Sequence, residues 1–283
     1  MIYFTDYELD RLLEDDAPVG DMTTELLGID HEPCSLLMTA RQLMVVSGVE
    51  EVVRLYQKVG VEVVEAVDSG TRCCQGQLIL RAKGDAGAVH AVWRTGGVLL
   101  AYASGVAGRT ALLVEKATAE NPSVSVAGTR KHPPYLKKVV LKAVIAGGGV
   151  FHRGGLSDTI LFFREHLIFR GGYNGLEDIV SAVRQKQKER KIVVEAHTAE
   201  EVMLCVRSGA DAVQIDKMPV PVFADCVRKS KLENPSVTIL AAGGVDGENA
   251  AAYARAGADV LVTSWMYYAP PADVQVEISP LNC

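Results

Sequence analysis

The second half of the chain alternates between short apolar runs and amphipathic stretches with a helical period. The apolar runs are Val124–Ala127, Ile160–Phe163, Ile192–Glu195, Ala212–Ile215, Val237–Leu240 and Val260–Thr263. The helical stretches between them include Leu176–Lys188, Thr198–Ser208 and Glu248–Ala256. Strands that are apolar throughout are buried on both faces, and intervening helices provide the crossovers that parallel strands require. The alternation therefore predicts βαβ units and a parallel sheet.

Polar residues or glycines follow nearly every one of these runs. They are Arg130, Lys131, Arg164–His166, Glu195, Asp216, Lys217, Gly243, Gly244 and Ser264. In a barrel of parallel strands, such positions converge at the C-terminal mouth, where catalytic groups lie. An open doubly wound sheet also collects ligands at strand ends, but at one switch point. We therefore predict a barrel with a functional site at its mouth.

The first half of the chain has a mixed pattern. Residues 5–16 and about 49–59 predict two short helices. Strands are expected at residues 35–39, 61–66 and 78–82, with turn residues between them. This half is therefore predicted to be an α+β domain.

Residues 86–118 differ from both halves because they are rich in small apolar residues and are interrupted by glycines. We interpret this segment as a tightly packed pair of helices that bridges the two halves. The expected division is an N-terminal domain over residues 1–110 and an α/β barrel over residues 111–269. The C-terminal tail, residues 270–283, is expected to pack on the first domain.

Charge and composition argue against several classes of protein. The 283 residues carry a net charge of −6 and the basic residues form no long block, so nucleic acid is not an expected partner. The N-terminus has neither the basic start nor the apolar core of a signal peptide. The most apolar stretches, Val98–Ala107 and Val139–Ala146, are shorter than a membrane span, so we expect no membrane partner.

Six cysteines are scattered along the chain without a C-x-x-C motif. In a chain of this size, that pattern is typical of reduced cytosolic thiols and not of a disulfide or zinc framework. His31, His90 and His197 also lack a metal-ligand spacing. The expected location is the cytoplasm.

Two basic, glycine-containing stretches flank one predicted helix. Residues 129–134 supply Arg130 and Lys131, and residues 147–153 supply His152 and Arg153. Arginine presents a planar fork that matches carboxylates and phosphates, and glycines let backbone N–H groups approach an anion closely. We predict a binding site for a small anion. A solvated basic loop with a flexible hinge is the alternative.

Glu195 and Asp216 end successive predicted strands, so their carboxylates are expected to face one cavity. Magnesium is commonly held by one or two carboxylates together with substrate phosphates. The same two carboxylates also suit sugar hydroxyls, and a third interpretation is that each simply pairs with a neighbouring cation.

A glycine pair follows the fifth predicted strand, and a serine follows the sixth. Gly243, Gly244 and Ser264 are typical of a phosphate cradle, because barrel enzymes often bind phosphate with the loops after their last strands. A plain turn that needs glycine for its backbone conformation is the alternative.

Several motifs occur in the same order as in the quinolinate phosphoribosyltransferase family and resemble them. The matching segments are Gly20-Asp21-Met22-Thr23-Thr24, Trp93-Arg94-Thr95, Ser104-Gly105-Val106-Ala107, Thr129-Arg130-Lys131, Gly147-Gly148-Gly149 with His152-Arg153, Leu156-Ser157-Asp158 and Gly243-Gly244. The resemblance implies an N-terminal α/β open sandwich and a TIM-like α/β barrel with fewer than eight strands. It also implies an enzyme of NAD biosynthesis. Such an enzyme forms a dimer or hexamer, in which Arg94 of one copy is donated to the site of another.

The resemblance assigns a role to each matching residue. Arg130, His152 and Arg153 would hold the substrate acid, Lys131 would lie near phosphoribosyl pyrophosphate, Glu195 and Asp216 would contact the ribose hydroxyls and magnesium, and Gly243, Gly244 and Ser264 would hold the 5-phosphate. The implied reaction joins phosphoribosyl pyrophosphate to a ring nitrogen of a heteroaromatic, quinolinate-like acid and releases pyrophosphate. Magnesium is the implied cofactor.

One position departs from the family pattern. Phe163 occupies the place of a family lysine, so a pocket for a dicarboxylate loses one counter-charge. This feature and the surrounding motif resemble the ModD branch, whose members are encoded beside molybdate transporters and are named as pyrophosphorylases. Whether decarboxylation follows transfer is left open by Phe163.

Two other functions are consistent with parts of this pattern. One is a non-catalytic anion-binding accessory protein of molybdate transport or utilisation, which needs the basic cluster but not Glu195 and Asp216 together. The other is a phosphate-binding aldolase, which needs a Schiff-base lysine within a strand. Lys217 comes just after a strand, which argues against the aldolase.

Overall fold

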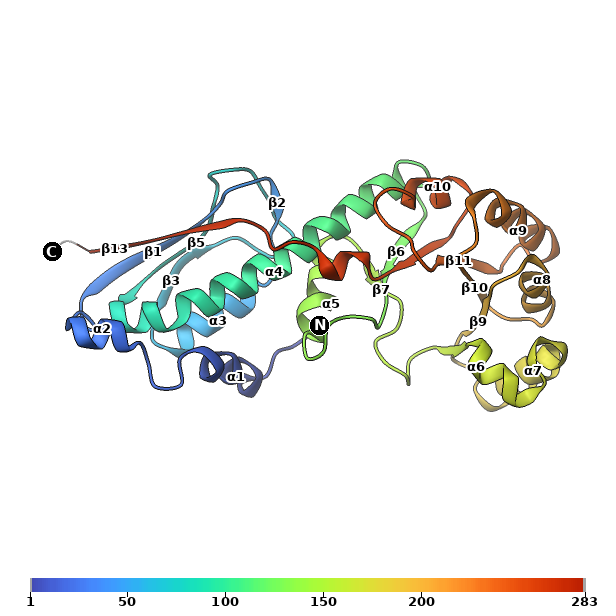
Figure 1. Ribbon diagram of the computed structural model, residues 1–283, viewed down its shortest axis with the longest axis horizontal. Coiled ribbons are helices and arrows are strands. Elements are labelled where there is room, and N and C mark those ends of the chain that lie inside the picture. Colours follow the sequence, from blue (N-terminus) through green and yellow to red (C-terminus); the bar gives the residue numbers. More distant parts are fainter. Residues whose placement is uncertain (1, 282–283) are drawn as a thin grey trace. The chain divides into compact units, whose positions relative to one another are not determined.

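The protein, seen in a computed structural model that describes residues 2–281, divides into two units (Figure 1). The first unit comprises the described residues of Met1–Ala111, His132–Gly148 and Met266–Cys283. The second comprises Leu112–Lys131 and Gly149–Trp265. Residues 132–148 therefore group with the first unit, whereas the sequence-based division places them in the barrel domain.

An antiparallel sheet with the strand order β13-β1-β5-β3 organises the first unit. Its strands are β1 (Pro33–Ala40), β3 (Glu62–Ala66), β5 (Leu78–Asp85) and β13 (Val274–Pro280), and the short strands β2 (Met44–Val45) and β4 (Arg72–Cys73) form a separate pair. Every second residue of β1 is buried, as expected for a strand with one face on a core. The last strand, β13, pairs with β1 from Cys34 opposite Pro280 to Ala40 opposite Val274.

Three short helices accompany this sheet: α1 (Asp6–Asp16), α2 (Met22–Leu27) and α3 (Val49–Lys58). Helix α1 is the first of the two predicted helices, and it begins with a capping box. The Thr5 hydroxyl accepts a hydrogen bond from the Glu8 backbone N–H, and the Glu8 carboxylate accepts one from the Thr5 backbone N–H. Helix α2 was not expected from the sequence. It is six residues long and is capped by Asp21.

Helix α4 (Ala86–Thr118) is one continuous helix of 33 residues, so the predicted pair of helices is wrong. Two of its glycines, Gly96 and Gly105, lie where other segments approach the helix closely. A Cβ atom at Gly96 would lie 2.9 Å from the Tyr56 ring, and one at Gly105 would overlap the backbone of Pro270. Glycine therefore serves close packing here rather than chain reversal.

Helix α4 is also long and apolar enough to cross a membrane, by length and composition alone. From the sequence, Val98–Ala107 was expected to be too short to span a membrane. The helix that contains it is longer than this stretch, because it continues at both ends. Half of the residues in the most apolar window are buried inside the protein, and the core helix of a globular protein passes the same test. The helix therefore does not by itself indicate a membrane.

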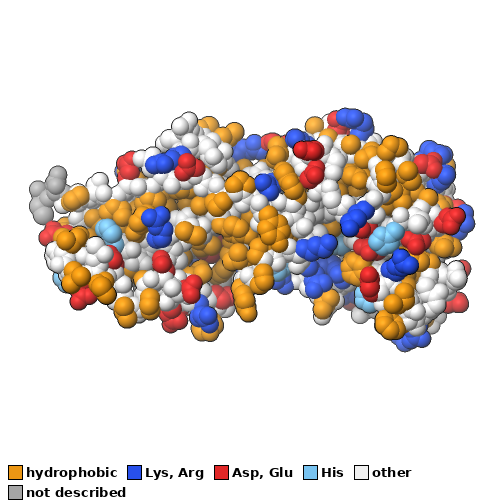
Figure 2. Space-filling view, viewed as in Figure 1, with side chains coloured by type: hydrophobic (Ala, Val, Ile, Leu, Met, Phe, Trp, Pro, Cys, Tyr) orange, Lys and Arg blue, Asp and Glu red, His pale blue; other side chains and the backbone are white. Residues whose placement is uncertain are grey.

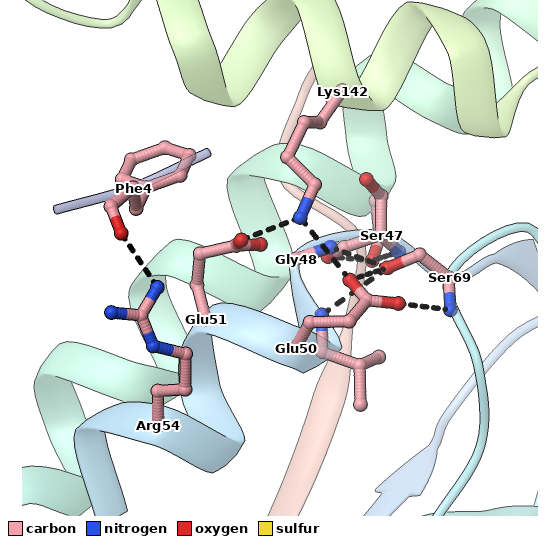
Figure 3. Close-up of polar contacts among 10 residues, drawn as sticks. Phe4, Ser47, Gly48, Glu50, Glu51, Arg54, Ser69 and Lys142 are labelled. Atoms are coloured by element: carbon pink, nitrogen blue, oxygen red, sulfur yellow. Dashed lines mark hydrogen bonds and ion pairs between the residues drawn. The ribbon is translucent and has the colours of Figure 1, made fainter. Parts of the chain in front are cut away.

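Helix α5 (Lys137–Ala146) is held within the first unit by paired charges (Figure 3). The Lys142 ammonium donates to Glu51 at 2.5 Å and to Glu50 at 3.5 Å. Glu50 also accepts hydrogen bonds from the hydroxyl and the backbone N–H of Ser69. Glu51 is only 5% exposed, so its charge is neutralised inside the protein.

The second unit contains a seven-stranded parallel sheet in the order β7-β6-β12-β11-β10-β9-β8. The strands are β6 (Ser125–Gly128), β7 (Val150–Phe151), β8 (Ile160–Phe162), β9 (Ile192–Ala196), β10 (Ala212–Asp216), β11 (Thr238–Ala242) and β12 (Val260–Thr263). The sheet curls into an incomplete barrel, because β7 and β8 are its two edges. The predicted α/β barrel with fewer than eight strands is therefore confirmed. The two-residue edge strand β7 was not predicted.

Helices cover the outer side of this sheet and apolar residues fill its inner side. The helices are α6 (Arg164–Leu167), α7 (Leu176–Lys186), α8 (Ala199–Arg207), α9 (Val220–Glu233) and α10 (Ala250–Arg255), with 3-10 turns η1 (Ile168–Arg170), η2 (Gly172–Gly175) and η3 (Trp265–Tyr268). The inner cluster consists of Ala127, Leu161, Val193, Ala212, Leu240, Ala242 and Val262. Side chains two residues apart on a strand point to the same side of the sheet. The inward-facing side chains nearer the C-terminal ends of the strands therefore lie between this cluster and the barrel mouth.

Candidate active site

A cavity of about 160 Å³ lies at the C-terminal ends of the barrel strands, within the second unit. Its basic lining consists of Arg130, Lys131, His152 and Arg153. Glu195 and Asp216 supply its carboxylates. Thr129, Leu161, Phe163, Gln214, Ala242, Gly243 and Val262 complete it. Cations and carboxylates from distant parts of the chain therefore share one hollow.

Arg153 is a buried cation without an acidic partner. Its side chain belongs to a residue that is 8% exposed, and among residues 2–281 no carboxylate lies within ion-pair distance of it. Burial, followed by the repulsion of Arg130, lowers the pKa of Arg153, and the negative charge of Asp158 opposes this shift. The guanidinium carbon lies 5.7 Å from the centre of the Phe163 ring. A buried charge is costly unless it is paired, so this site is built to receive an anion.

Arg130 and Lys131 follow β6 and are exposed. Within the described part of the chain, neither forms an ion pair, and the Lys131 backbone N–H donates to the Thr129 hydroxyl at 3.1 Å. Three positive charges thus face the cavity, and none of them forms an ion pair within the described residues, although the Asp158 charge partly offsets that of Arg153. This arrangement suits an anionic ligand with more than one charged group.

His152 is held neutral at physiological pH. Burial is the main reason that the pKa of His152 falls to about 4, and the nearby Arg153 charge adds to the effect. His152 therefore offers an uncharged imidazole that can donate or accept a hydrogen bond, in contrast to the permanent charges of its arginine neighbours.

The two carboxylates form a second, acidic side of the cavity. Glu195 is largely buried and accepts a hydrogen bond of 2.6 Å from the Gln214 amide. His197 lies between the carboxylates, 3.4 Å from Glu195 and 3.8 Å from Asp216. Burial raises the pKa of Glu195; the Gln214 hydrogen bond opposes this, and the Asp216 charge adds to it.

The donor chemistry of this side fits a magnesium ion that is shared with a phosphate ligand. Two carboxylates are what such an ion usually takes from the protein, with phosphate and water oxygens completing the shell. Within the described residues, no group of three or more His, Cys, Asp or Glu side chains is arranged to hold a metal ion. Glu195 and Asp216 therefore suit a ligand-borne cation better than a resident structural metal.

Gly243 brings the end of β11 against the acidic side. It has a φ of 77°, and a Cβ atom there would overlap the Asp216 carboxylate. Only glycine allows both the left-handed backbone and this close approach. Gly244 also has a left-handed φ, of 92°, but faces open space, so only its backbone conformation favours glycine.

Three of the predicted site residues do not line the cavity. Gly244 and Ser264 belong to the second unit but lie outside its lining. Arg94 belongs to the first unit, where it is exposed and its guanidinium carbon lies 4.0 Å from the centre of the Trp93 ring. Lys217 is exposed and also lies outside the lining, which gives no support to a Schiff-base lysine.

Sequence reasoning missed Gln214 and gave no role to His197. Gln214 lies two residues before Asp216 in a strand, so both side chains point to the same side of the sheet. A polar residue at that spacing within an apolar run was the available signal. His197 was considered only as a zinc ligand, and its position between two carboxylates depends on the pairing of β9 with β10.

Larger hollows also occur in the described part of the protein. One of about 750 Å³ in the first unit has a mainly apolar lining, and its acids and bases, including Lys142 and Arg54, pair with each other. One of about 500 Å³ in the second unit adjoins the candidate site, because both are lined by Arg153, Leu161 and Phe163. On the face shown in Figure 2, hydrophobic side chains are exposed across the left half, and several Lys and Arg side chains gather right of centre.

Family models match both parts of the chain. The C-terminal domain of quinolinate phosphoribosyl transferase matches residues 106–277, and its N-terminal domain matches residues 21–104. The chain belongs to the quinolinate phosphoribosyltransferase family. Members of this family are pentosyltransferases, so the chain is an enzyme of the glycosyltransferase class.

Curated relatives agree with this assignment and include the ModD branch. The chain is 34% identical to "Putative pyrophosphorylase ModD" of Pasteurella multocida over 98% of its length and 99% of the relative. It is 37% identical to the protein of the same name from Rhodobacter capsulatus over 91% of its length and 98% of the relative. A "Probable nicotinate-nucleotide pyrophosphorylase (carboxylating)" of Methanothermobacter thermautotrophicus is 28% identical over 96% of this chain and 98% of the relative.

Solved structures share the fold. The crystal structure of NadC from Streptococcus pyogenes has a TM-score of 0.88 with this chain, at 21% sequence identity, and covers 99% of both chains. The nicotinate-nucleotide pyrophosphorylase from Francisella tularensis has a TM-score of 0.85 at 21% identity, over 96% of this chain and 94% of that one. The N-terminal α+β domain and the incomplete α/β barrel are thus both features of the family fold.

Proposed function

We propose that the protein transfers the phosphoribosyl group of phosphoribosyl pyrophosphate to a ring nitrogen of a heteroaromatic acid and releases pyrophosphate. The observation that carries this proposal is the buried guanidinium of Arg153, which forms no ion pair within the described residues and shares one cavity with Glu195 and Asp216. A simple anion binder needs only the basic side. A ligand with negative groups at its ends and a hydroxylated sugar between them needs both sides.

The residues divide between the parts of the two substrates. Arg130 and Arg153 would hold the carboxylate of the acceptor acid, and the neutral imidazole of His152 would add a hydrogen bond. Glu195 and Asp216 would accept hydrogen bonds from the ribose hydroxyls. Gly243, Gly244 and Ser264 would bind the 5-phosphate through the loops after β11 and β12.

The transfer breaks the bond between C1 of the ribose and the pyrophosphate oxygen, and pyrophosphate leaves with the electron pair. A lone pair of the ring nitrogen forms the new bond to C1. Positive charge develops on the sugar in such displacements, as in glycoside hydrolysis. The fixed carboxylates of Glu195 and Asp216 would stabilise that charge, and Lys131 would stabilise the leaving pyrophosphate. The remaining contribution is the alignment of the two substrates.

Magnesium fits the acidic side, where Glu195 and Asp216 would hold it together with phosphate oxygens, and when bound it would neutralise charge on the pyrophosphate. The chain's own residues set the position of the sugar relative to this charge. Gln214 fixes one oxygen of Glu195, which keeps that carboxylate directed at the cavity.

The acceptor is expected to be a flat anion with fewer charges than a dicarboxylate. Phe163 presents an aromatic ring beside the Arg153 guanidinium, where a second cation would be needed for a second carboxylate. Aromatic rings stack on planar ligands, and guanidinium groups bind carboxylates. This supports a heteroaromatic monocarboxylate as the acceptor. Such an acid lacks the second carboxyl group that a dicarboxylate could lose as carbon dioxide after transfer.

Assembly and location belong to the same proposal. We propose a cytoplasmic homo-oligomer in which Arg94 of one copy completes the site of another. Arg94 is exposed and has a ring, not a carboxylate, as its neighbour, so its charge is free to meet an anion. Substitution of Arg94 by alanine is expected to weaken substrate binding without changing the stability of each copy.

The test is release of pyrophosphate. The protein is mixed with magnesium, phosphoribosyl pyrophosphate and each of a panel of pyridine mono- and dicarboxylates, and pyrophosphate is measured by a coupled assay. Release with at least one monocarboxylate supports the proposal. No release with any acid, combined with tight binding of molybdate or another oxyanion by calorimetry, would favour an anion-binding accessory protein instead.

A further inference from the structure

Gln214 lies where the inner face of the barrel is otherwise apolar. It is 5% exposed, and its direct neighbours across the sheet are Glu195 on β9 and Leu240 on β11. Leu240 and Ala212 belong to the apolar cluster inside the barrel, and Asp216 lies one inward position closer to the mouth. Gln214 is therefore the boundary between the apolar floor and the polar cavity.

The two ends of the Gln214 amide differ in their hydrogen bonding. Nε2 donates to Glu195 Oε2 at 2.6 Å, whereas Oε1 is buried and has no hydrogen-bond partner among the described residues. An ionised carboxylate can only accept, so the amide must present its NH₂ group to Glu195 and its oxygen in the other direction. The orientation of the unpaired oxygen is thus fixed by chemistry.

A buried carbonyl oxygen without a donor is destabilising. A methionine of similar size would fill the same space without this penalty and without polar atoms in the floor. The amide is therefore better explained by a ligand that brings the missing donor. Gln214 lines the cavity, so a ligand bound there would lie next to its terminal amide.

The position of β10 identifies which part of the ligand this is. Glu195, Asp216 and Gly243 come from β9, β10 and β11, which are adjacent in the sheet. Arg130 and Arg153 come from the end of β6 and the segment after β7, which are separated from β10 by β11 and β12. The group above Gln214 therefore meets mainly acceptors, which are two carboxylates and one amide oxygen, and the His197 imidazole lies between the two carboxylates. Such a set favours hydroxyl donors and disfavours phosphate or carboxylate.

We propose that Gln214 determines recognition of the sugar: its NH₂ group positions Glu195, and its carbonyl oxygen accepts a hydrogen bond from a ribose hydroxyl. The inference rests on the proposed function, since it takes phosphoribosyl pyrophosphate as the ligand. It adds that Gln214 recognises a ribose hydroxyl of that ligand. It makes Gln214 a specificity residue for hydroxylated over deoxygenated sugar phosphates.

The test compares binding by isothermal titration calorimetry, in the presence of magnesium, for the wild type, Gln214→Met and Leu240→Met. The ligands are phosphoribosyl pyrophosphate, ribose 5-phosphate and its 2-deoxy and 3-deoxy forms. Loss of one hydrogen bond and of the Glu195 support is expected to weaken phosphoribosyl pyrophosphate binding by Gln214→Met about tenfold. The wild type should discriminate against one deoxy form, and Gln214→Met should lose that discrimination. Leu240→Met changes a residue in the same layer of the barrel. It should keep both the affinity for phosphoribosyl pyrophosphate and the discrimination against the deoxy form.

The outcomes separate the inference from the proposed function. A wild type that binds no phosphoribosyl pyrophosphate overturns both. Equal affinity of the wild type and Gln214→Met for phosphoribosyl pyrophosphate overturns this inference alone. So does a Gln214→Met variant that changes only the Michaelis constant for the acceptor acid. If Gln214→Met does not fold by circular dichroism, Gln214→Asn takes its place. Its amide is one methylene shorter and is expected to lose the same discrimination.

Discussion

Two clusters of charged residues in this protein have opposite designs. In the first unit, Lys142 pairs with Glu50 and Glu51, and every charged group in that cluster has a partner. In the barrel cavity, the buried Arg153 has no acidic partner in the described chain, and the carboxylates lie apart from the cations. Neutralised charges hold helix α5 in place, whereas unneutralised charges await a ligand. The difference separates a structural site from a binding site without reference to cavity size.

The largest expected effect comes from removing the unpaired cation. Arg153→Met should lower the catalytic efficiency about 100- to 1000-fold, because a charge that stabilises the bound acid is lost. The free energy of unfolding should not fall, since no ion pair is broken and a buried charge is removed. Pyrophosphate release and urea denaturation measure the two quantities.

Arg207→Met is the matched control for this substitution. Arg207 lies on the outer helix α8, is exposed and pairs with Glu233 at 3.4 Å. Its loss is expected to change neither activity nor stability. A destabilised Arg153→Met with normal activity would show that the two clusters do not differ in the way described.

The reverse result is expected for the paired cluster. Lys142→Met leaves the Glu51 carboxylate buried without its cation and should lower the free energy of unfolding by about 2–3 kcal/mol. The folded variant should keep nearly wild-type turnover. The double variant Lys142→Met with Glu51→Gln removes both charges, and recovery of most of the lost stability in urea denaturation checks the mechanism.

The pH dependence of stability sharpens the comparison at His152. Its pKa of about 4 in the folded protein lies below the ordinary value of 6.5, so between these values the unfolded chain binds more protons than the folded one. Stability from this group is therefore present above about pH 6.5 and is lost as the pH falls toward 4. The wild type should lose on the order of 2 kcal/mol more than His152→Gln between pH 7 and pH 4.5.

Unfolding in urea at the two pH values measures this difference. Equal losses for the wild type and His152→Gln would mean that His152 is solvated and charged in the folded protein. The cavity would then carry a fourth positive charge below about pH 6.5.

The smallest expected effect concerns the acceptor. Phe163→Lys adds a cation beside Arg153 and should raise the use of a pyridine dicarboxylate relative to a monocarboxylate about tenfold. Phe163→Leu keeps the position apolar and serves as the control. An unchanged preference in Phe163→Lys, measured as a ratio of catalytic efficiencies, would show that charge at this position does not select the acid.

Much of the second unit is predictable from the sequence because its strands are apolar runs bounded by helices with clear periodicity. All six predicted runs correspond to strands, and seven of the predicted site residues meet in one cavity. Helix α4 was not predicted as one helix because the low helix propensity of glycine is offset there by tertiary packing, such as the approach of Tyr56 to Gly96. The neutral state of His152 and the orphan oxygen of Gln214 likewise depend on burial, which no local pattern reports.

The most direct test of the account is a crystal structure of the protein with magnesium and phosphoribosyl pyrophosphate. We expect the ligand in the barrel cavity, with its ribose against Glu195 and Asp216, and with Lys131 at the pyrophosphate. A ligand bound elsewhere, or one whose ribose lies away from both carboxylates, would contradict it.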